Sequence, residues 1–400
     1  MNDAEEKENG ICGAAGDGAE EIARLVPAGS VAAVFAECEE TLGAYARLLR
    51  KRGITARRLP LHTSVRKLQE MQPDADVRLA VALGGNAAAD CAKFWGKTHG
   101  LPVFAAVTSP CALRVLSPWC ELYDGDVLRP VRGVAPQGAA AVCDLVRAGE
   151  NELPAAFGEL AATAVCLFDG AATARATGRR VNATLYERIL DEISDTLAYA
   201  AEAGREDAHL PCVLAQASLG AARRLQGEEE IFFGGAECCA RTAEMLFGYE
   251  ARKPMLRGET AFVFGAVLAE MYRAFADAPS AFLPPPDNNL RAERLAEYLG
   301  WGELTAAKAA TGLRLPVALV AYRLGEYRDE LSEFAADACR LFEQAKRTFR
   351  RLYRDDGFSL RGALDSSDVR AVVALAPDTF PAGLSALALM RELGFLERYL

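Results

Sequence analysis

Two adjacent glycines, Gly84 and Gly85, carry the clearest chemical signal in this sequence. The apolar run 77–83 before them predicts a buried strand, and the segment 86–97 after them predicts a helix. Glycines at such a turn let the backbone approach a phosphate, and the first N–H groups of the helix can donate to an anion. A tight strand-to-helix turn without a ligand has the same pattern, so both interpretations stay open at this point.

Histidine and cysteine, the usual ligands of transition metals, form no recognisable metal-binding pattern. The three histidines are His62, His99 and His209, and none has the spacing of metal ligands such as H-x3-H. We interpret them as surface or capping residues. The 11 cysteines include no C-x-x-C pair and no disulfide framework. We therefore expect reduced thiols, as is typical of a cytoplasmic protein.

Composition restricts the classes of partner. The chain of 400 residues has a formal net charge of −10, which argues against nucleic acid because phosphate backbones require a basic surface. It has no run of 18 apolar residues, so we expect no membrane partner. A small-molecule substrate stays possible, including an anionic one, because such a ligand needs only a local positive patch.

The order of the predicted elements indicates two domains. Short apolar runs alternate with helical periodicity up to about residue 147, which predicts an α/β domain with a doubly wound, mostly parallel sheet. Asp124-Gly125-Asp126 predicts a hairpin within this domain. Periodicity of 3.6 residues dominates afterwards and predicts an all-α domain. We assign residues 1–20 to a poorly structured tail, 21–147 to a nucleotide-binding domain and 148–400 to a helical domain.

The glycine turn resembles a family signature. The segment 83–93, LGGNAAADCAK, is similar to the GGGSxxDxxK pattern of iron-containing alcohol dehydrogenases, glycerol-1-phosphate dehydrogenase and dehydroquinate synthase. Gly84, Gly85, Asp90 and Lys93 match this pattern. Asn86 replaces the third glycine, and asparagine tolerates left-handed backbone angles better than other non-glycine residues, so we expect the turn to be retained.

Further motifs of this family follow in the same order between residues 25 and 280. They lie at 102–117, 140–144, 154–159, 235–238 and 257–261. The resemblance implies a dehydroquinate synthase-like fold, a homodimer and bound NAD(P). The implied cofactor-binding residues are Gly84, Gly85, Asn86, Asp90, Thr108 and Ser109.

The three positions that hold the metal in the family are changed in this chain. The resemblance places Glu159 at the aspartate position, Cys238 at the first histidine and Arg257 at the second. Arginine has no lone pair to donate and stays charged, so we expect no divalent metal. We consider two roles for Arg257. It forms an ion pair with Glu159, or it faces the cleft and binds a carboxylate or phosphate.

Two functions are consistent with these residues. The first is an NAD(P)-dependent oxidoreductase that acts on a small hydroxyl or carbonyl compound without the family's metal, with Lys93 and Arg257 as catalytic candidates. Leu113 and Arg114 stand where glycerol-1-phosphate dehydrogenases have an aspartate, which argues against glycerol-type substrates. The second is a non-catalytic relative that binds a nucleotide or a partner in the interdomain cleft.

Overall fold

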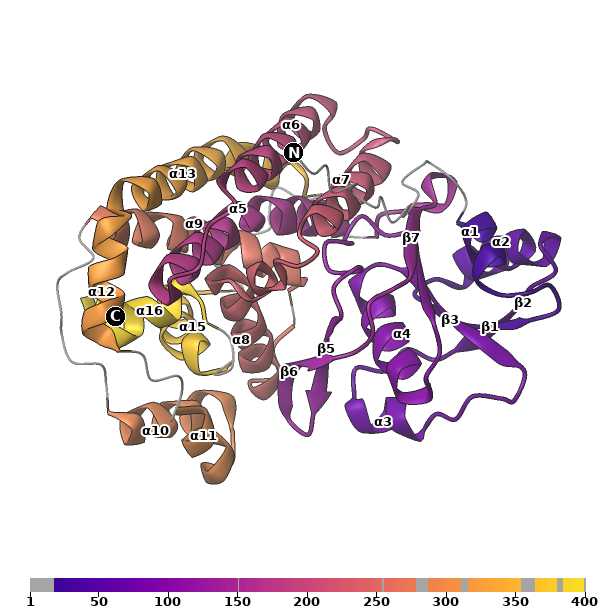
Figure 1. Ribbon diagram of the computed structural model, residues 1–400, viewed down its shortest axis with the longest axis horizontal. Coiled ribbons are helices and arrows are strands. Elements are labelled where there is room, and N and C mark those ends of the chain that lie inside the picture. The colour runs from indigo at the N-terminus through magenta and orange to yellow at the C-terminus, as the bar shows by residue number, and fades with distance from the viewer. Residues whose placement is uncertain are drawn as a thin grey trace, which may run out of the picture.

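The computed structural model describes residues 18–149, 151–253, 255–277, 287–310, 316–353, 364–379 and 384–398. Figure 1 shows a strand-containing part at one end of the molecule and a larger helical part at the other. The predicted tail, 1–20, lies mostly outside the described residues. Its last two residues already belong to helix α1 (Ala19–Leu25), so the predicted boundary was placed slightly too late.

Five parallel strands form the central sheet of the first part, in the order β2-β1-β3-β4-β7. Their bounds are β1 (Val31–Ala36), β2 (Thr55–Leu59), β3 (Val77–Gly84), β4 (Val103–Val107) and β7 (Gly138–Ala141). Alternate β1 residues enter two different apolar cores, one shared with α4 (Asn86–His99) and one with α2 (Glu39–Lys51). Helices thus cover both faces, which confirms the predicted doubly wound α/β fold.

A two-stranded hairpin projects from this sheet toward the helical part (Figure 1). Strands β5 (Trp119–Asp124) and β6 (Val127–Arg132) pair antiparallel, and the turn between them contains Gly125 at φ 66°. The hairpin predicted from Asp124-Gly125-Asp126 is therefore confirmed. It packs against α4 on one side and against α8 (Gly235–Tyr249) on the other, so it links the two parts of the chain.

Helix α5 (Glu152–Thr177) is the central helix of the second part, and nearly all of its residues are buried. It is long and apolar enough to cross a membrane, but its apolar window lies wholly inside the protein. Helix α9 (Arg257–Asp277) crosses it closely. A Cβ atom added at Gly158 would lie 2.1 Å from the carbonyl oxygen of Gly258, so glycine is required at this crossing.

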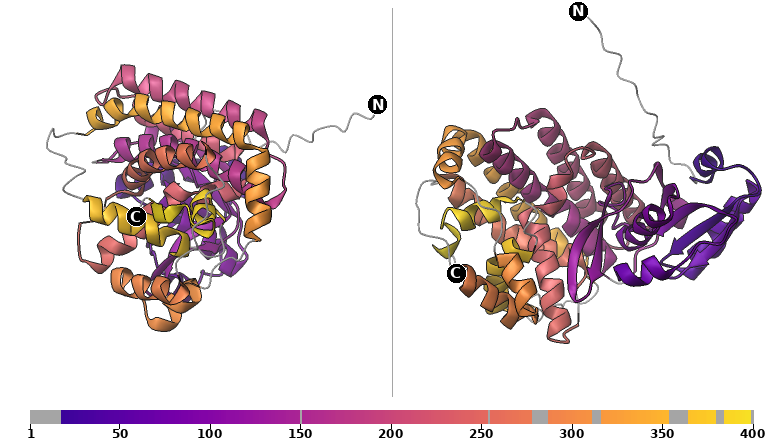
Figure 2. Two further views of the ribbon diagram at one scale, coloured as in Figure 1. Left: turned by 90° about the vertical axis from the view of Figure 1, so that its left-hand side faces the viewer. Right: turned by 60° about the horizontal axis from the view of Figure 1, so that its bottom comes forward.

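The remaining helices pack around α5, α8 and α9, as the two views of Figure 2 show. They are α6 (Ala183–Ala203), α7 (Leu210–Arg224), α10 (Asn288–Leu299), α11 (Glu303–Ala310), α12 (Val317–Glu326), α13 (Arg328–Arg351), α15 (Ser366–Thr379) and α16 (Ala386–Glu392). Helix α3 (Val65–Glu70) and the 3-10 turns η1 (Cys143–Leu145), η2 (Glu229–Phe233) and η3 (Leu396–Arg398) complete the described elements.

A disulfide joins the two parts of the chain and corrects one prediction. Cys143 in η1 is bonded to Cys212 in α7, 69 residues later, so the expectation of reduced thiols was wrong for this pair. Helix α7 also packs its Ala215 and Leu219 into the core on one face of the sheet. The other cysteines of the described residues are free thiols, and most are buried.

Candidate functional site

The site lies where the strand order of the sheet reverses, between the carboxyl ends of β1 and β3. Ligands of open α/β sheets bind at this switch point because the neighbouring loops diverge there. In this chain the crevice opens into a cavity of about 370 Å³ between the sheet, the hairpin and helices α5, α8 and α9. Gly85, Asn86 and Asp90 line it from the turn, and Glu159 and Arg257 line it from the helical part.

The glycine turn holds a carboxylate from the neighbouring strand. Glu37 follows β1, and its two carboxylate oxygens accept hydrogen bonds from the N–H groups of Gly85 and Ala88, both at 3.1 Å. A Cβ atom at Gly84, which has φ 154°, would lie 2.5 Å from the Cδ atom of Glu37. The helix N-terminus therefore does present N–H groups to an anion, and in this structure the anion is Glu37.

Asn86 has a different role from the one predicted. It is the first residue of α4 and is not among the residues with positive φ, so tolerance of left-handed angles is not the reason for asparagine here. Its side chain connects the two parts of the site. The Nδ2 atom donates to Oε1 of Glu159 at 2.8 Å, and Oδ1 accepts from the backbone N–H of Arg114 at 2.9 Å.

Lys93 does not reach the cavity. Its side chain is fully buried, and its ammonium group contacts Asp90 at 3.0 Å and donates to the carbonyl oxygens of Arg114 and Trp119 at 3.1 and 2.6 Å. All three N–H donors are thus used to hold the segment after β4 and the start of the hairpin. This geometry indicates a positioning role for Lys93, and its catalytic role stays a prediction.

The other predicted cofactor residues surround the turn. Asp90 lines the cavity, and its second oxygen accepts from the backbone N–H of Glu121 at 3.2 Å. Ser109 lines the cavity as well, whereas Thr108 contributes a backbone hydrogen bond to the carbonyl oxygen of Gly84 at 3.1 Å. The structure thus brings these residues together at one place, and their role in binding a cofactor stays a prediction.

Three arginines converge on one glutamate of the hairpin. Glu121 on β5 is paired with Arg114 at 2.5 Å, with Arg241 of α8 at 2.8 Å and with Arg257 at the start of α9. Arg257 also pairs with Glu244 of α8 at 2.5 Å. These side chains are mostly buried, so the ion pairs are poorly screened by solvent. The network connects both parts of the chain across the cavity.

Sequence reasoning missed Glu121, Arg241 and Glu244. The two α8 residues share a helix face with Glu237, because positions i, i+4 and i+7 lie on one side of a helix. Three charged residues at that spacing, in a helix with an otherwise apolar composition, were a usable signal. Nothing local pointed to Glu121, because its partners come from distant parts of the chain.

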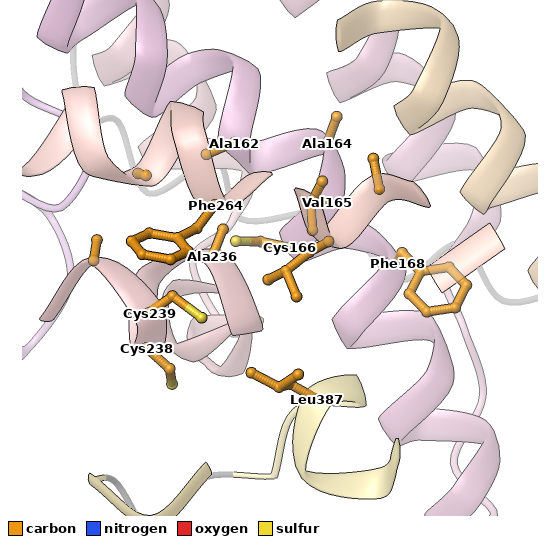
Figure 3. Packing of buried hydrophobic residues seen from close by; sticks show 14 of the residues in the cluster. Ala162, Ala164, Val165, Cys166, Phe168, Ala236, Cys238, Cys239, Phe264 and Leu387 are labelled. Carbon is orange, nitrogen blue, oxygen red and sulfur yellow. The ribbon is translucent and has the colours of Figure 1, made fainter. Parts of the chain in front are cut away.

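Of the three positions that the family resemblance assigns to the metal, Glu159 and Arg257 line the cavity and Cys238 does not. The Cys238 thiol donates to the carbonyl oxygen of Phe233 at 3.1 Å, and Figure 3 shows Cys238 among buried side chains such as Leu387. It does not line the cavity. Arg257 brings a fixed positive charge to its position. Among the described residues no group of three or more His, Cys, Asp and Glu side chains is arranged to hold a metal. These side chains do not fit the family's cation.

The predicted ion pair between Glu159 and Arg257 is not formed. Arg257 pairs with Glu121 and Glu244, while the Glu159 carboxylate accepts one hydrogen bond among the described residues, from Asn86. Glu159 is 3% exposed, and its Oε2 atom has no hydrogen-bond partner in the described part of the protein. Burial raises the pKa of Glu159 to about 7, and Arg114 opposes this shift only in part.

The architecture is that of the iron-containing alcohol dehydrogenases. Alcohol dehydrogenase ADH/D1 from an archaeal halo-thermophilic Red Sea brine pool source, solved with NZQ bound, superposes with a TM-score of 0.57 at 13% identity, covering 96% of this chain and 94% of that one. The iron-containing alcohol dehydrogenase of Corynebacterium glutamicum gives 0.52 at 15% identity, covering 95% and 92%.

A probable glycerol dehydrogenase from Sinorhizobium meliloti gives a TM-score of 0.50 at 16% identity, covering 80% of this chain and 94% of that one. Neither a family model nor a curated protein sequence matches the chain. The comparisons therefore establish a shared fold over most of the chain at low sequence identity.

Proposed function

We propose that this chain is a divergent member of the iron-containing alcohol dehydrogenase family that interconverts a small alcohol and its carbonyl compound without a metal. One observation carries this proposal. The cavity is lined by Glu159 and Arg114, and among the described residues the buried Oε2 atom of Glu159 has no donor and the buried Nε atom of Arg114 has no acceptor. A substrate hydroxyl can satisfy both, because it has one donor and two acceptor positions.

The pKa of Glu159 suits proton transfer to or from such a hydroxyl. A general acid or base works best when its pKa is near the working pH, and burial raises the pKa of Glu159 to about 7. During oxidation of an alcohol, the Glu159 carboxylate would accept the hydroxyl proton. Arg114 would donate a hydrogen bond to the oxygen and stabilise its developing charge, the task that the cation performs in metal-dependent relatives.

The glycine turn suits the phosphates of a dinucleotide. The carboxylate of Glu37 stands in for a phosphate there, which shows that the N–H groups of Gly85 and Ala88 converge on an anion. These two groups would hold the cofactor's pyrophosphate once Glu37 turns away. Bound NAD(P) would supply or accept the hydride.

The sequence alone left an anionic substrate possible, but the charges that line the cavity favour a neutral one. Its lining includes two arginines, Arg114 and Arg257, and both are already paired with carboxylates. The acidic residues of the lining outnumber them. They are Glu37, Asp90, Glu121, Glu152, Glu159 and Glu244. An anionic substrate would have to displace one of these ion pairs to contact either arginine.

The experiment measures the reduction of small neutral aldehydes and ketones through the absorbance of NADH or NADPH. The pH is varied by about two units on either side of the pKa of Glu159, which is about 7. We expect turnover in the wild type and a large loss of kcat in Glu159→Gln. Glu187→Gln, a charge change on the exposed face of α6, is the control and should behave as the wild type. Equal kcat in wild type and Glu159→Gln would contradict the proposed role of Glu159.

A specific observation also favours the second candidate, a non-catalytic relative. Glu37 already occupies the anion position of the turn, which a retained cofactor site would keep free. This candidate predicts that neither NADH nor NADPH binds, and that no carbonyl compound is reduced. Isothermal calorimetry with both dinucleotides separates the two candidates without relying on a chosen substrate.

A further inference from the structure

We infer that Glu37 is an internal competitor for the dinucleotide and sets how tightly this chain binds it. The inference rests on the proposed function, because it concerns the same cofactor site. The two carboxylate oxygens of Glu37 accept hydrogen bonds from the N–H groups of Gly85 and Ala88. The phosphate oxygens of a dinucleotide would need the same two N–H groups. The glycine signature in this chain therefore accommodates a carboxylate of the protein itself.

The contact depends on features from three places in the sequence. Gly85 is the N-cap residue of α4 and supplies no side-chain cap, so the first N–H groups of the helix need an outside acceptor. Glu37 provides it from the end of β1, at 3.1 Å from each of the two nitrogen atoms. Gly84 makes room, since a Cβ atom there would meet the Glu37 side chain at 2.5 Å.

The surroundings of Glu37 make it unable to share the turn with a phosphate. Asp90 and Glu152 line the same cavity and add negative charge, and no ion pair with Glu37 is formed among the described residues. A pyrophosphate placed at the turn would face this carboxylate directly. Glu37 lines the cavity but is partly exposed to solvent, so its side chain can turn away without opening an apolar core.

A purely structural role makes a different prediction. If Glu37 only caps α4, its replacement lowers stability and leaves dinucleotide affinity unchanged. If it instead contacts the cofactor favourably, replacement weakens binding. Competition alone predicts that removing the charge tightens binding, so the sign of the change distinguishes the three roles.

The test uses the full chain with Glu37→Gln and Glu37→Ala, and measures NADH and NADPH affinity by calorimetry at fixed ionic strength. Glu37→Gln keeps the side-chain length and one acceptor, so it carries the test if Glu37→Ala does not fold. The control is Glu40→Gln, which removes the same charge from an exposed position at the start of α2. Inorganic pyrophosphate serves as a second probe of the turn alone.

We expect both Glu37 variants to bind dinucleotide and pyrophosphate on the order of tenfold more tightly, since hydrogen bonds to a charged acceptor no longer compete. Glu40→Gln should bind as the wild type does. If the wild type binds dinucleotide and Glu37→Gln binds it equally or more weakly, this inference is overturned and the proposed function stands. Absence of dinucleotide binding in the wild type and in both Glu37 variants would overturn both.

Discussion

Removal of the Glu121 charge should be the most destabilising single change in the cavity. The Glu121 side chain is 7% exposed, and it accepts from Arg241 at 3.1 and 2.8 Å and from Arg114 at 2.5 Å, in addition to its pair with Arg257. In Glu121→Gln the three guanidinium groups stay buried and lose their common counter-ion. Breaking a buried ion pair on one side typically costs about 3–5 kcal/mol.

Urea unfolding followed by circular dichroism measures this cost. The matched control is Glu39→Gln, which breaks the exposed pair between Glu39 and Arg58 and should cost less than about 1 kcal/mol. Since a folded domain is stable by only about 5–15 kcal/mol, the Glu121 variant should unfold at a clearly lower urea concentration. A loss for Glu121→Gln no larger than that of the control would refute the idea that this network holds the two parts together.

Three further outcomes follow from the structure. Burial raises the pKa of Glu159 from 4.5 to about 7, so the folded protein keeps a proton that the unfolded chain releases. Wild-type stability should therefore fall as pH rises between these values, and Glu159→Gln should show a flatter profile in thermal unfolding. Cys143→Ser should lower the melting temperature under oxidising conditions, because the Cys143–Cys212 disulfide links residues 69 positions apart and should stabilise the fold by roughly 4 kcal/mol. Dithiothreitol should abolish the difference between the variant and the wild type. Gly85→Ala should destabilise by roughly 1–3 kcal/mol in the same urea assay, since its Cβ atom would lie 2.4 Å from the carbonyl oxygen of Cys111; an unchanged midpoint would show that this segment relaxes freely.

The fold could be predicted because its signals are local. The apolar run of β3 and the Asp124-Gly125 turn are complete within a few residues, and each specifies its element without help from distant segments. The order of these elements then fixed the sheet type.

The site was only partly predictable because its contacts are between distant residues. The family pattern places Cys238 at the site, but its thiol donates to the carbonyl oxygen of Phe233, a contact that the sequence does not reveal. A family pattern carried over by sequence cannot show whether such a side chain lines the cavity or packs beside it. Lys93 matched the pattern as well, yet its ammonium group is directed at backbone carbonyls.

If the site works without a metal, its turnover should not depend on divalent cations. NAD(P)H-dependent reduction of neutral aldehydes should be assayed after treatment with EDTA, with and without added Zn²⁺ or Fe²⁺, while the metal content of the protein is measured in parallel. The arrangement of Arg257 and Glu121 predicts turnover that neither EDTA nor added metal changes, and less than one metal per chain. Turnover that EDTA abolishes and Zn²⁺ or Fe²⁺ restores would contradict it.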